Sequence, residues 1–371
     1  MRGTVGVDIG ATAVRVVEVT GVDQSGYALV SAIGLAPLPL NAVVAGKIRS
    51  PRDASIALAK AIRMAGVSKR GFIIGVSTPT TSFENRVLPT SLSSSERETH
   101  LRTLGKPLGS NYGLDESVIA TYLARTDQGD TTLSTIGVSS ALDDDVAAVQ
   151  AVCDLAKCSP RAIDLSAAAT MRAMTRVNVS SMEIGSIVDV GASKVTVTTR
   201  QGMHLRTVRT TAGGGDDITK AIAASLNISF KEAEDLKYTQ KLSANFSRIA
   251  QRGAYATQEE TINTEEALLA DALNSSADLL IDSIAQSIES SSSAGPLPQG
   301  VTLCGLGACL LRGFKDRLQR RTGIPVTIVK PWAEIEKSKR NAEYFRQGRP
   351  DPAVLISLAT ATGLALWKEP L

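Results

Sequence analysis

The sequence is poor in several residue types that particular functions require. Aromatic residues make up 4% of its 371 residues and the net charge is only +3, so neither base stacking nor a basic surface points to nucleic acid. Two histidines accompany four cysteines, and the cysteines form two C-x4-C pairs, a spacing that disfavours a zinc site. Buried free thiols in a reducing compartment fit these cysteines better.

Long apolar runs and consensus nucleotide loops are also missing. No apolar stretch approaches the roughly 18 residues that a membrane span needs, so we expect no transmembrane helix and no direct membrane insertion. The chain enters a strand that contains a charged residue near its start, which is unlike a signal peptide. No G-x4-G-K-[ST] sequence occurs, which excludes a P-loop.

The length of 371 residues suits two domains or one duplicated pair. One short stretch, Gly6–Glu18, organises the first half, because two β-branched runs flank a turn of small residues and so predict a hairpin. The turn at Gly10-Ala11-Thr12 lets backbone N–H groups approach an anion closely, and Asp8 at the strand end is a carboxylate that could meet a metal ion. A buried hairpin without any ligand has the same pattern.

A second copy of this hairpin lies about half a chain away. Residues 188–195 repeat residues 7–14 with five of eight positions identical, including Asp189 and Gly191. Such a repeat indicates two related domains that present the same turn. Two turns that face each other across a cleft could hold a polyphosphate, and their aspartates could hold its magnesium through waters.

Hydrophobic patterning predicts an α/β chain with an inserted segment. Three strands are expected within residues 4–35, then a helix over residues 52–65 and a buried strand at Phe72–Val76. Residues 79–160 change to a strand–helix–strand–strand–helix order that is typical of a small α+β insert.

The later part of the chain contains two glycine turns. The first, Gly213-Gly214-Gly215, precedes a helix. The second, Gly305-Leu306-Gly307, follows a strand and is expected to enter a helix over Leu310–Arg320, whose positive end and backbone N–H groups suit a phosphate. Residues 333–351 appear charged and surface-like, and Val354–Leu366 predicts one apolar closing helix.

These features resemble the actin-like ATPase superfamily. The two hairpins look like its phosphate loops, and the strand and turn at Leu303–Gly307 look like its adenosine loop. The stretch Gly213–Ile222, followed by Glu232–Lys237, is similar to that of the family of the type IV pilus assembly protein PilM, a relative of the cell-division protein FtsA.

The resemblance implies an α/β protein with a duplicated actin-like (ribonuclease H-like) ATPase fold, an α+β 1C insert and a 2B subdomain. The implied boundaries are 1–78 and 161–182 for 1A, 79–160 for 1C, 183–228 and 300–371 for 2A, and 229–299 for 2B.

The resemblance also implies that ATP and Mg²⁺ lie between the halves, with Asp8 and Asp189 near the metal and holding it through water. The candidates for the phosphates are Gly10, Ala11, Thr12, Arg15, Gly191, Ala192 and Ser193. Those for the ribose and base are Gly213, Gly214, Gly215, Glu234, Lys237, Gly305, Leu306 and Gly307. Two purely structural alternatives stay open. Glu234 and Lys237 also fit a solvated i,i+3 surface pair, and Gly213–Gly215 also fits a helix-entry turn.

Two departures from the family bear on activity. Family members often carry Gly-Gly in the adenosine loop, whereas Leu306 separates the two glycines here, which argues against close packing of this loop under the base. The segment Leu165–Arg172 offers no Gln or Glu to orient a water, and Asp164 is the one carboxylate nearby, so slow or absent turnover is expected.

The resemblance implies a cytoplasmic adaptor that binds the N-terminal tail of a PilN-like inner-membrane protein in a groove between 1A and 1C, near Thr78–Leu88 and Asp143–Arg161. Pilus motor ATPases and self-association are further expected contacts, in a pilus or a related type II secretion system. The stretch from Gly363 to Leu371 lacks a basic amphipathic helix, so recruitment to the membrane through the partner is expected. The alternatives are an FtsA-like filament-forming ATPase and an actin-fold sugar kinase or phosphatase.

Overall fold

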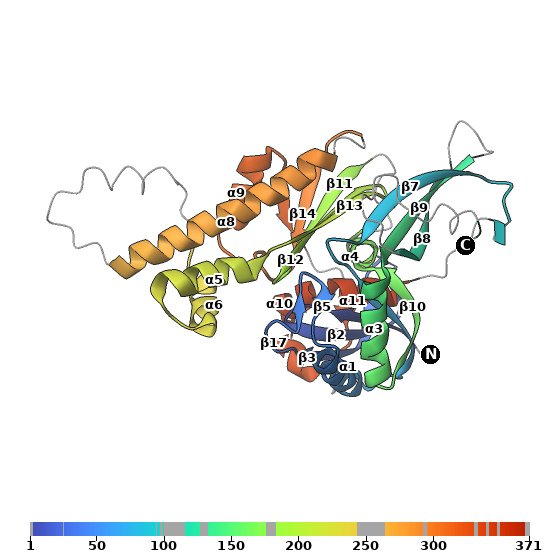
Figure 1. The fold of residues 1–371 in the computed structure, drawn as a ribbon, viewed down its shortest axis with the longest axis horizontal. Helices are drawn as coiled ribbons and strands as arrows, with labels where there is room; N and C mark the ends of the chain where they lie inside the picture. The colour runs from blue at the N-terminus through green and yellow to red at the C-terminus, as the bar shows by residue number, and fades with distance from the viewer. Residues whose placement is uncertain are drawn as a thin grey trace.

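The computed structural model shows two α/β halves with a cleft between them (Figure 1). The structure describes residues 3–24, 26–93, 95–96, 99, 116–126, 133–175, 183–242, 264–291, 295–329, 333–338, 341–346 and 349–367. None of the helices in these ranges is long and apolar enough to cross a membrane.

The first half is built on a six-stranded sheet. Its strands are β1 (Thr4–Ile9), β2 (Ala13–Val22), β3 (Ala28–Pro37), β6 (Arg70–Val76), β10 (Ser159–Leu165) and β16 (Ala333–Ile335). They lie in the order β10-β6-β1-β2-β3-β16. β1 and β2 pair antiparallel, and β1 pairs parallel with β6, so the expected hairpin lies at the centre of the sheet.

The second half repeats this arrangement in five strands. They are β11 (Ile184–Val190), β12 (Lys194–Gln201), β13 (His204–Ala212), β14 (Gly300–Cys304) and β15 (Val326–Ile328). Their order, β13-β12-β11-β14-β15, corresponds to β3-β2-β1-β6-β10 of the first sheet. β11 and β12 form the second hairpin, and β11 pairs parallel with β14. The internal repeat in the sequence therefore reflects a duplicated sheet.

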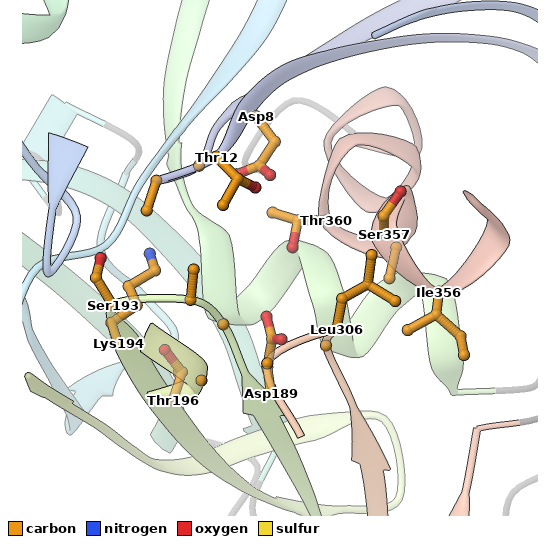
Figure 2. A pocket seen from close by; sticks show the side chains of 18 of the residues that line it. Asp8, Thr12, Asp189, Ser193, Lys194, Thr196, Leu306, Ile356, Ser357 and Thr360 are labelled. Carbon is orange, nitrogen blue, oxygen red and sulfur yellow. The ribbon is translucent and has the colours of Figure 1, made fainter. Parts of the chain in front are cut away.

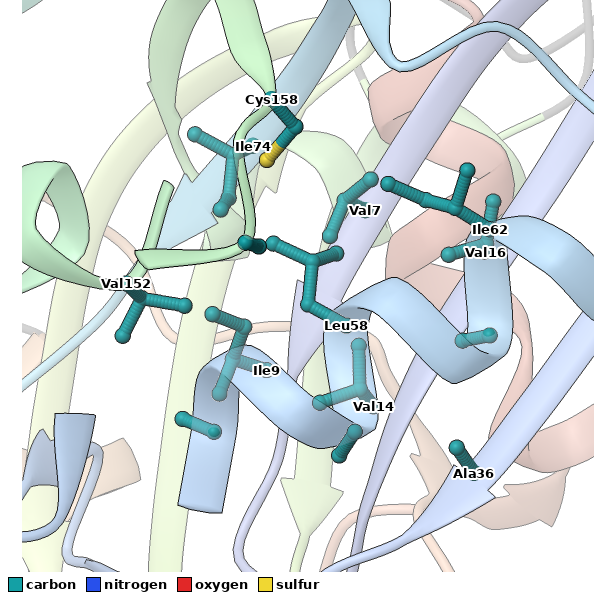
Figure 3. Close-up of a cluster of buried hydrophobic side chains, with 14 of the residues drawn as sticks. Val7, Ile9, Val14, Val16, Ala36, Leu58, Ile62, Ile74, Val152 and Cys158 are labelled. Atoms are coloured by element: carbon teal, nitrogen blue, oxygen red, sulfur yellow. The ribbon is translucent and has the colours of Figure 1, made fainter. Parts of the chain in front are cut away.

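Local signals set the first long helix, α1 (Pro51–Ala65). Ser50 caps its start by accepting a hydrogen bond from the Asp53 N–H, and Pro51 occupies the first helical position. Gly66 ends the helix with φ of 65°, a conformation that favours glycine. The buried face of α1 carries Leu58, which packs in an apolar cluster with β-branched residues of the hairpin (Figure 3).

A separate three-stranded sheet forms the insert. It contains β7 (Ser82–Pro89), β8 (Glu116–Thr126) and β9 (Leu133–Leu142) in the order β7-β9-β8, followed by α3 (Asp143–Leu155). Most of the helix expected after Ser93 lies outside the described residues, but its capping box is present, since Glu96 accepts from the Ser93 N–H at 2.8 Å. Asn85 of β7 donates to the Leu205 carbonyl at 3.4 Å, so the insert touches the second half.

Within the described residues, four helices lie in the second half. They are α5 (Gly215–Leu226), α6 (Phe230–Thr239), α8 (Thr264–Ser290) and α9 (Phe314–Thr322). The long α8 projects outward from this half (Figure 1). The loop-rich segment expected at 243–265 falls mostly outside the described residues. α4 (Ser166–Met174) belongs to the first half but packs its Ala167, Ala168 and Met171 against the second sheet.

The end of the chain differs from expectation. β16 pairs parallel with β3, so residues 333–351 are not simply a charged surface segment. The expected closing helix is two helices, α10 (Pro352–Ser357) and α11 (Ala359–Ala365). A Cβ on Gly6 of β1 would stand 2.0 Å from the Ala361 carbonyl, so α11 lies directly on the first sheet. The subdomain boundaries remain a prediction, but these elements complete the first sheet although we grouped them with the second half.

The short elements are β4 (Val43–Val44), β5 (Lys47–Ile48), the 3-10 turn Ala342–Tyr344, β17 (Phe345–Arg346) and β18 (Arg349–Pro350). β4 and β5 form a small hairpin whose turn, at Ala45 and Gly46, reaches the second half, because the Ala45 N–H donates to Ser193 Oγ at 2.9 Å.

Two substitutions on α1 test this account of the core. Leu58 is fully buried, so Leu58→Ala should lower the free energy of unfolding by about 2–5 kcal/mol through lost burial and a new cavity. Ile56 is 59% exposed on the same helix, and Ile56→Ala should stay within about 0.5 kcal/mol of the wild type. Urea denaturation measures both, and equal losses would contradict the packing described.

Candidate functional site

A cavity of about 380 Å³ lies between the two halves, and both hairpins line it. Asp8 approaches from the first sheet and Asp189 from the second, so the two aspartates share one crevice (Figure 2). The turn residues Gly10, Ala11, Thr12, Gly191, Ala192 and Ser193 line the same cavity. The duplicated fold thus brings the two copies of the motif together.

The two hairpin turns have the same closing hydrogen bond. The Gly10 N–H donates to the Ala13 carbonyl at 3.0 Å, and the Gly191 N–H donates to the Lys194 carbonyl at 2.9 Å. Each turn therefore adopts a matching conformation directly after its aspartate.

The second turn is fixed from behind by the two glycine turns. Its carbonyls at Val190, Gly191, Ala192 and Ser193 accept from the N–H groups of Gly307, Gly215, Asp216 and Gly213, at 2.8 to 3.1 Å. In a trans peptide the N–H points opposite to the C=O. The N–H groups of Ala192 and Ser193 therefore point away from the glycine turns, on the side where these residues line the cavity, which is an arrangement that suits an anion.

The same contacts explain why glycine occupies these positions. A Cβ on Gly214 would stand 2.4 Å from the Gly191 carbonyl, and one on Gly307 would stand 2.1 Å from it. Gly213 and Gly214 do not line the cavity, whereas Gly215 does. The structure thus places Gly213 and Gly214 behind the second turn, as its support.

Charged side chains concentrate where the hairpins meet. Arg15 forms an ion pair with Asp8 at 3.5 Å, and Lys194 of the second hairpin is near enough to both aspartates to interact with them electrostatically. Burial raises the pKa of Asp189, and Lys194 opposes this shift. Burial lowers the pKa of Lys194, while Asp8 and Asp189 favour its charged form. Two carboxylates and two cations thus surround this end of the cavity.

A buried ion pair forms another wall. Lys237 is 1% exposed and donates to Glu234 Oε2 at 2.7 Å, to Thr219 Oγ1 at 2.9 Å and to the Gly215 carbonyl at 3.2 Å. Thr219 also donates to Glu234. The solvated surface pair is therefore wrong for Lys237, because its ammonium joins α6 to the start of α5. Burial lowers the pKa of Lys237, and Glu234 partly offsets that shift.

The remaining wall is more apolar. Leu306 and Ile356 point into the cavity in Figure 2, and Leu310 also lines it. Tyr238 Oη donates to the Leu306 carbonyl at 2.7 Å, which ties α6 to the second glycine turn. The helix expected over Leu310–Arg320 begins only at Phe314, as α9. The prediction that its positive N-terminal end lies at Gly305–Gly307 is therefore wrong, and a turn occupies the residues between.

All predicted site residues except Gly213 and Gly214 line the cavity, including Arg15, Gly305 and Gly307. Sequence reasoning missed Lys194, although it is the one position where the repeat gains a charge. It also missed Asp216, Tyr238, Ser357 and Thr360, which carry no motif and reach the cavity only through packing.

Two further features bear on chemistry. Within the described ranges, no group of three or more His, Cys, Asp or Glu side chains could hold a metal ion, so a magnesium ion at Asp8 and Asp189 would need water or phosphate ligands. Asp164 is fully buried and ion-paired with Arg172, while the adjacent residues that line the cavity are Ser166, Ala167 and Thr170.

Two family models and several solved structures are similar to this chain. The family model described as "Type IV pilus assembly protein PilM" matches residues 6–250, and that of "Cell division protein FtsA" matches residues 186–347. The structure of a PilM–PilN type IV pilus biogenesis complex is similar with a TM-score of 0.70 and 20% identity, covering 98% of each chain. The structure of the ethanolamine utilization protein EutJ from Carboxydothermus hydrogenoformans is similar with a TM-score of 0.52 and 15% identity, and the match covers 98% of this chain and 89% of the EutJ chain.

Curated relatives match over a shorter region. The cell division protein FtsA of Streptococcus pneumoniae is 27% identical over 158 residues, which is 42% of this chain and 34% of that protein. FtsA of Enterococcus hirae is 26% identical over 151 residues, which is 39% of this chain and 33% of that protein. The match therefore spans about a third of these relatives. The fold class expected from the sequence, a duplicated actin-like fold, is confirmed by the structural neighbours.

The buried pair on α6 yields an asymmetric prediction. Glu234→Gln should lower the free energy of unfolding by about 1–3 kcal/mol at pH 7, because it leaves the Lys237 ammonium buried without its counterion. Losing Glu234 lowers the pKa of Lys237 further, so the unfolded chain binds more protons and the penalty should shrink as the pH rises toward the ordinary lysine value of 10.5.

Lys237→Met is the matched variant. Its loss at pH 7 should be smaller, because the Glu234 side chain is 34% exposed and can be hydrated, and it should not shrink as the pH rises, because this variant has no buried ammonium to lose its proton. Denaturation curves at several pH values compare the two, and a penalty for Glu234→Gln that grows with pH would contradict this account.

Proposed function

We propose, from the premise that this chain belongs to the PilM family of type IV pilus assembly proteins, that it is an ATP-binding adaptor of pilus assembly. One observation carries the nucleotide part of this proposal: two copies of an Asp-Xaa-Gly hairpin, from two copies of one sheet, line a single cavity. A polyphosphate is the ligand that fits backbone N–H groups, two cations and two carboxylates best.

The residues divide into three roles along the cavity. The two turns, with Arg15 and Lys194, would contact the phosphates, and Asp8 and Asp189 would hold Mg²⁺ through waters. Bound Mg²⁺ would neutralise phosphate charge. Glu234 and Lys237 would lie toward the ribose, and Leu306 with Ile356 would pack on the base. Gly213 and Gly214 act indirectly, by supporting the second turn.

We infer that the nucleotide is held more than it is consumed. Turnover needs a group that orients the attacking water. Asp164 is occupied by Arg172, and Ser166, Ala167 and Thr170 contribute no carboxylate or amide to the cavity. The same lack disfavours the sugar kinase alternative, which requires a catalytic base beside the nucleotide.

The proposed partner is the cytoplasmic N-terminal tail of a PilN-like inner-membrane protein, and this contact would place the chain at the cytoplasmic side of that membrane. Its support is the likeness to a PilM–PilN complex over 98% of the chain. The proposed groove lies between the first half and the insert, near Thr78–Leu88 and Asp143–Arg161. Within these segments Leu155 at the end of α3 and Val87 of β7 are large apolar side chains, each 57% exposed. Motor ATPases are a further proposed contact.

An FtsA-like filament-forming ATPase is the second candidate, because the FtsA family model matches residues 186–347. Self-association in the presence of ATP, measured by pelleting, would favour it over the adaptor.

Calorimetric titration with ATP tests the nucleotide site. The wild type should bind ATP about tenfold more tightly with Mg²⁺ than with EDTA, and Asp189→Asn should remove most of that difference. Asp235→Asn is the control, since Asp235 is exposed on α6 next to Glu234 but does not line the cavity. Absence of ATP binding, or a Mg²⁺ effect that Asp189→Asn preserves, would refute the proposed site. Rapid phosphate transfer to hexoses would favour a kinase.

A second test concerns the tail. A fluorescent peptide that copies the cytoplasmic tail of the PilN-like protein should bind the wild type, and Leu155→Asp should weaken it by about tenfold because an apolar contact would be lost. Leu279→Asp is the matched control, since Leu279 is 74% exposed on α8, away from the insert. Fluorescence anisotropy measures both affinities, and equal effects of the two variants would argue against this groove.

A further inference from the structure

Lys194 distinguishes the second hairpin from the first, which carries Ala13 at the matching position. Its side chain lines the main cavity and also a small neighbouring cavity of about 10 Å³, formed by residues that include Ser77, Thr78 and Asp145. Figure 2 shows it extending from the second hairpin toward the side of the cavity that carries Thr12. One side chain thus connects two sites.

The Lys194 ammonium holds the segment that leads from the first sheet into the insert. Its Nζ donates to the Ser77 carbonyl at 2.9 Å. Ser77 follows the end of β6, and the turn residue Gly46 packs on the same carbonyl, because a Cβ there would stand 1.9 Å from the Ser77 oxygen. The second hairpin therefore contacts the first half at the root of the insert.

Thr78, the next residue, contacts α3 of the insert. Its hydroxyl donates to Asp145 Oδ2 at 2.8 Å, and its N–H donates to Thr81 Oγ1 at 2.9 Å. Thr80 donates to the same carboxylate oxygen at 3.0 Å. Asp145 lies in the first turn of α3, so residues 77–81 join the sheet, the insert and α3 through polar contacts that centre on the buried Thr78 and Asp145.

The bond to Ser77 would compete with a bound polyphosphate. The Ser77 carbonyl is a neutral acceptor, whereas a phosphate oxygen is anionic and makes a stronger, charge-assisted hydrogen bond with an ammonium. A lysine side chain is flexible enough to change partners without movement of its backbone. A ligand that fills the main cavity would therefore offer Lys194 a better acceptor than the one it has.

We propose that Lys194 is a positioning residue that couples occupancy of the cleft to the 77–81 segment. A bound polyphosphate takes the ammonium from the Ser77 carbonyl, and the segment at the root of the insert loosens. This inference rests on the proposed nucleotide function and specifies how that site would be linked to the insert, which also borders the proposed tail groove.

Hydrogen–deuterium exchange with and without saturating ATP and Mg²⁺ tests the coupling. In the wild type, the amides of Ser77, Thr78, Thr80 and Thr81 should exchange roughly fivefold faster with the nucleotide, as expected for the loss of one hydrogen bond that holds the segment. In Lys194→Met they should exchange at the fast rate without ATP and should not respond to it. Lys194→Gln is the second variant, for the case that Lys194→Met does not fold. It keeps an N–H donor but lacks the charge, so it should also show no response to ATP.

Lys231→Met is the matched control, because Lys231 is exposed on α6 and does not line either cavity. It should respond as the wild type does. Protection of the two hairpin turns reports ATP binding separately. If the turns become protected but the 77–81 segment does not change, or changes equally in Lys194→Met, the coupling is refuted while the nucleotide site stands. If the turns are not protected, the nucleotide function fails, and the coupling fails with it.

Discussion

The orientation of one short loop governs the rest of the site. Four carbonyls of the second hairpin turn, from Val190 to Ser193, accept hydrogen bonds from the two glycine turns and from Asp216 at the start of α5. That arrangement turns the opposite N–H groups outward and fixes where Asp189 and Lys194 begin. It also requires glycine at Gly214 and Gly307, because any Cβ there would overlap the Gly191 carbonyl. The proposed anion site of the cleft thus depends on backbone packing, to which side chains add charge.

Duplication explains the shape of the site, and the differences between the copies explain its chemistry. The two sheets share a strand order and the two turns share a closing hydrogen bond. However, Arg15 pairs with Asp8 within the first half, whereas Lys194 reaches across to the first half from the second. The joint at α4 is apolar, while Ser193 and Lys194 make polar contacts across the cleft. The proposed charged ligand would therefore act on the polar end and leave the apolar joint intact.

Features set by neighbouring residues could be predicted from the sequence, and those set by distant packing could not. The hairpins, the cap at Ser50 and the end of α1 at Gly66 follow from local patterns, and the structure contains all of them. The repeat also predicted that Asp8 and Asp189 would meet. In contrast, β16 is too short to show a pattern and exists only because β3 offers a free edge. Likewise, the start of α9 at Phe314 depends on what packs against it. The same is true of the supporting role of Gly213 and Gly214.

Lys237 shows how burial separates two interpretations that the sequence leaves equal. A Glu and a Lys three residues apart on a helix usually form an exposed pair that contributes little. Here the ammonium is buried and also bonds Thr219 and the Gly215 carbonyl, so the pair fixes α6 against the start of α5. The same α5 start donates to the second hairpin turn through Gly215 and Asp216. The polar wall and the second hairpin turn are therefore joined by one hydrogen-bonded assembly, so a ligand that orders one of them would also affect the other.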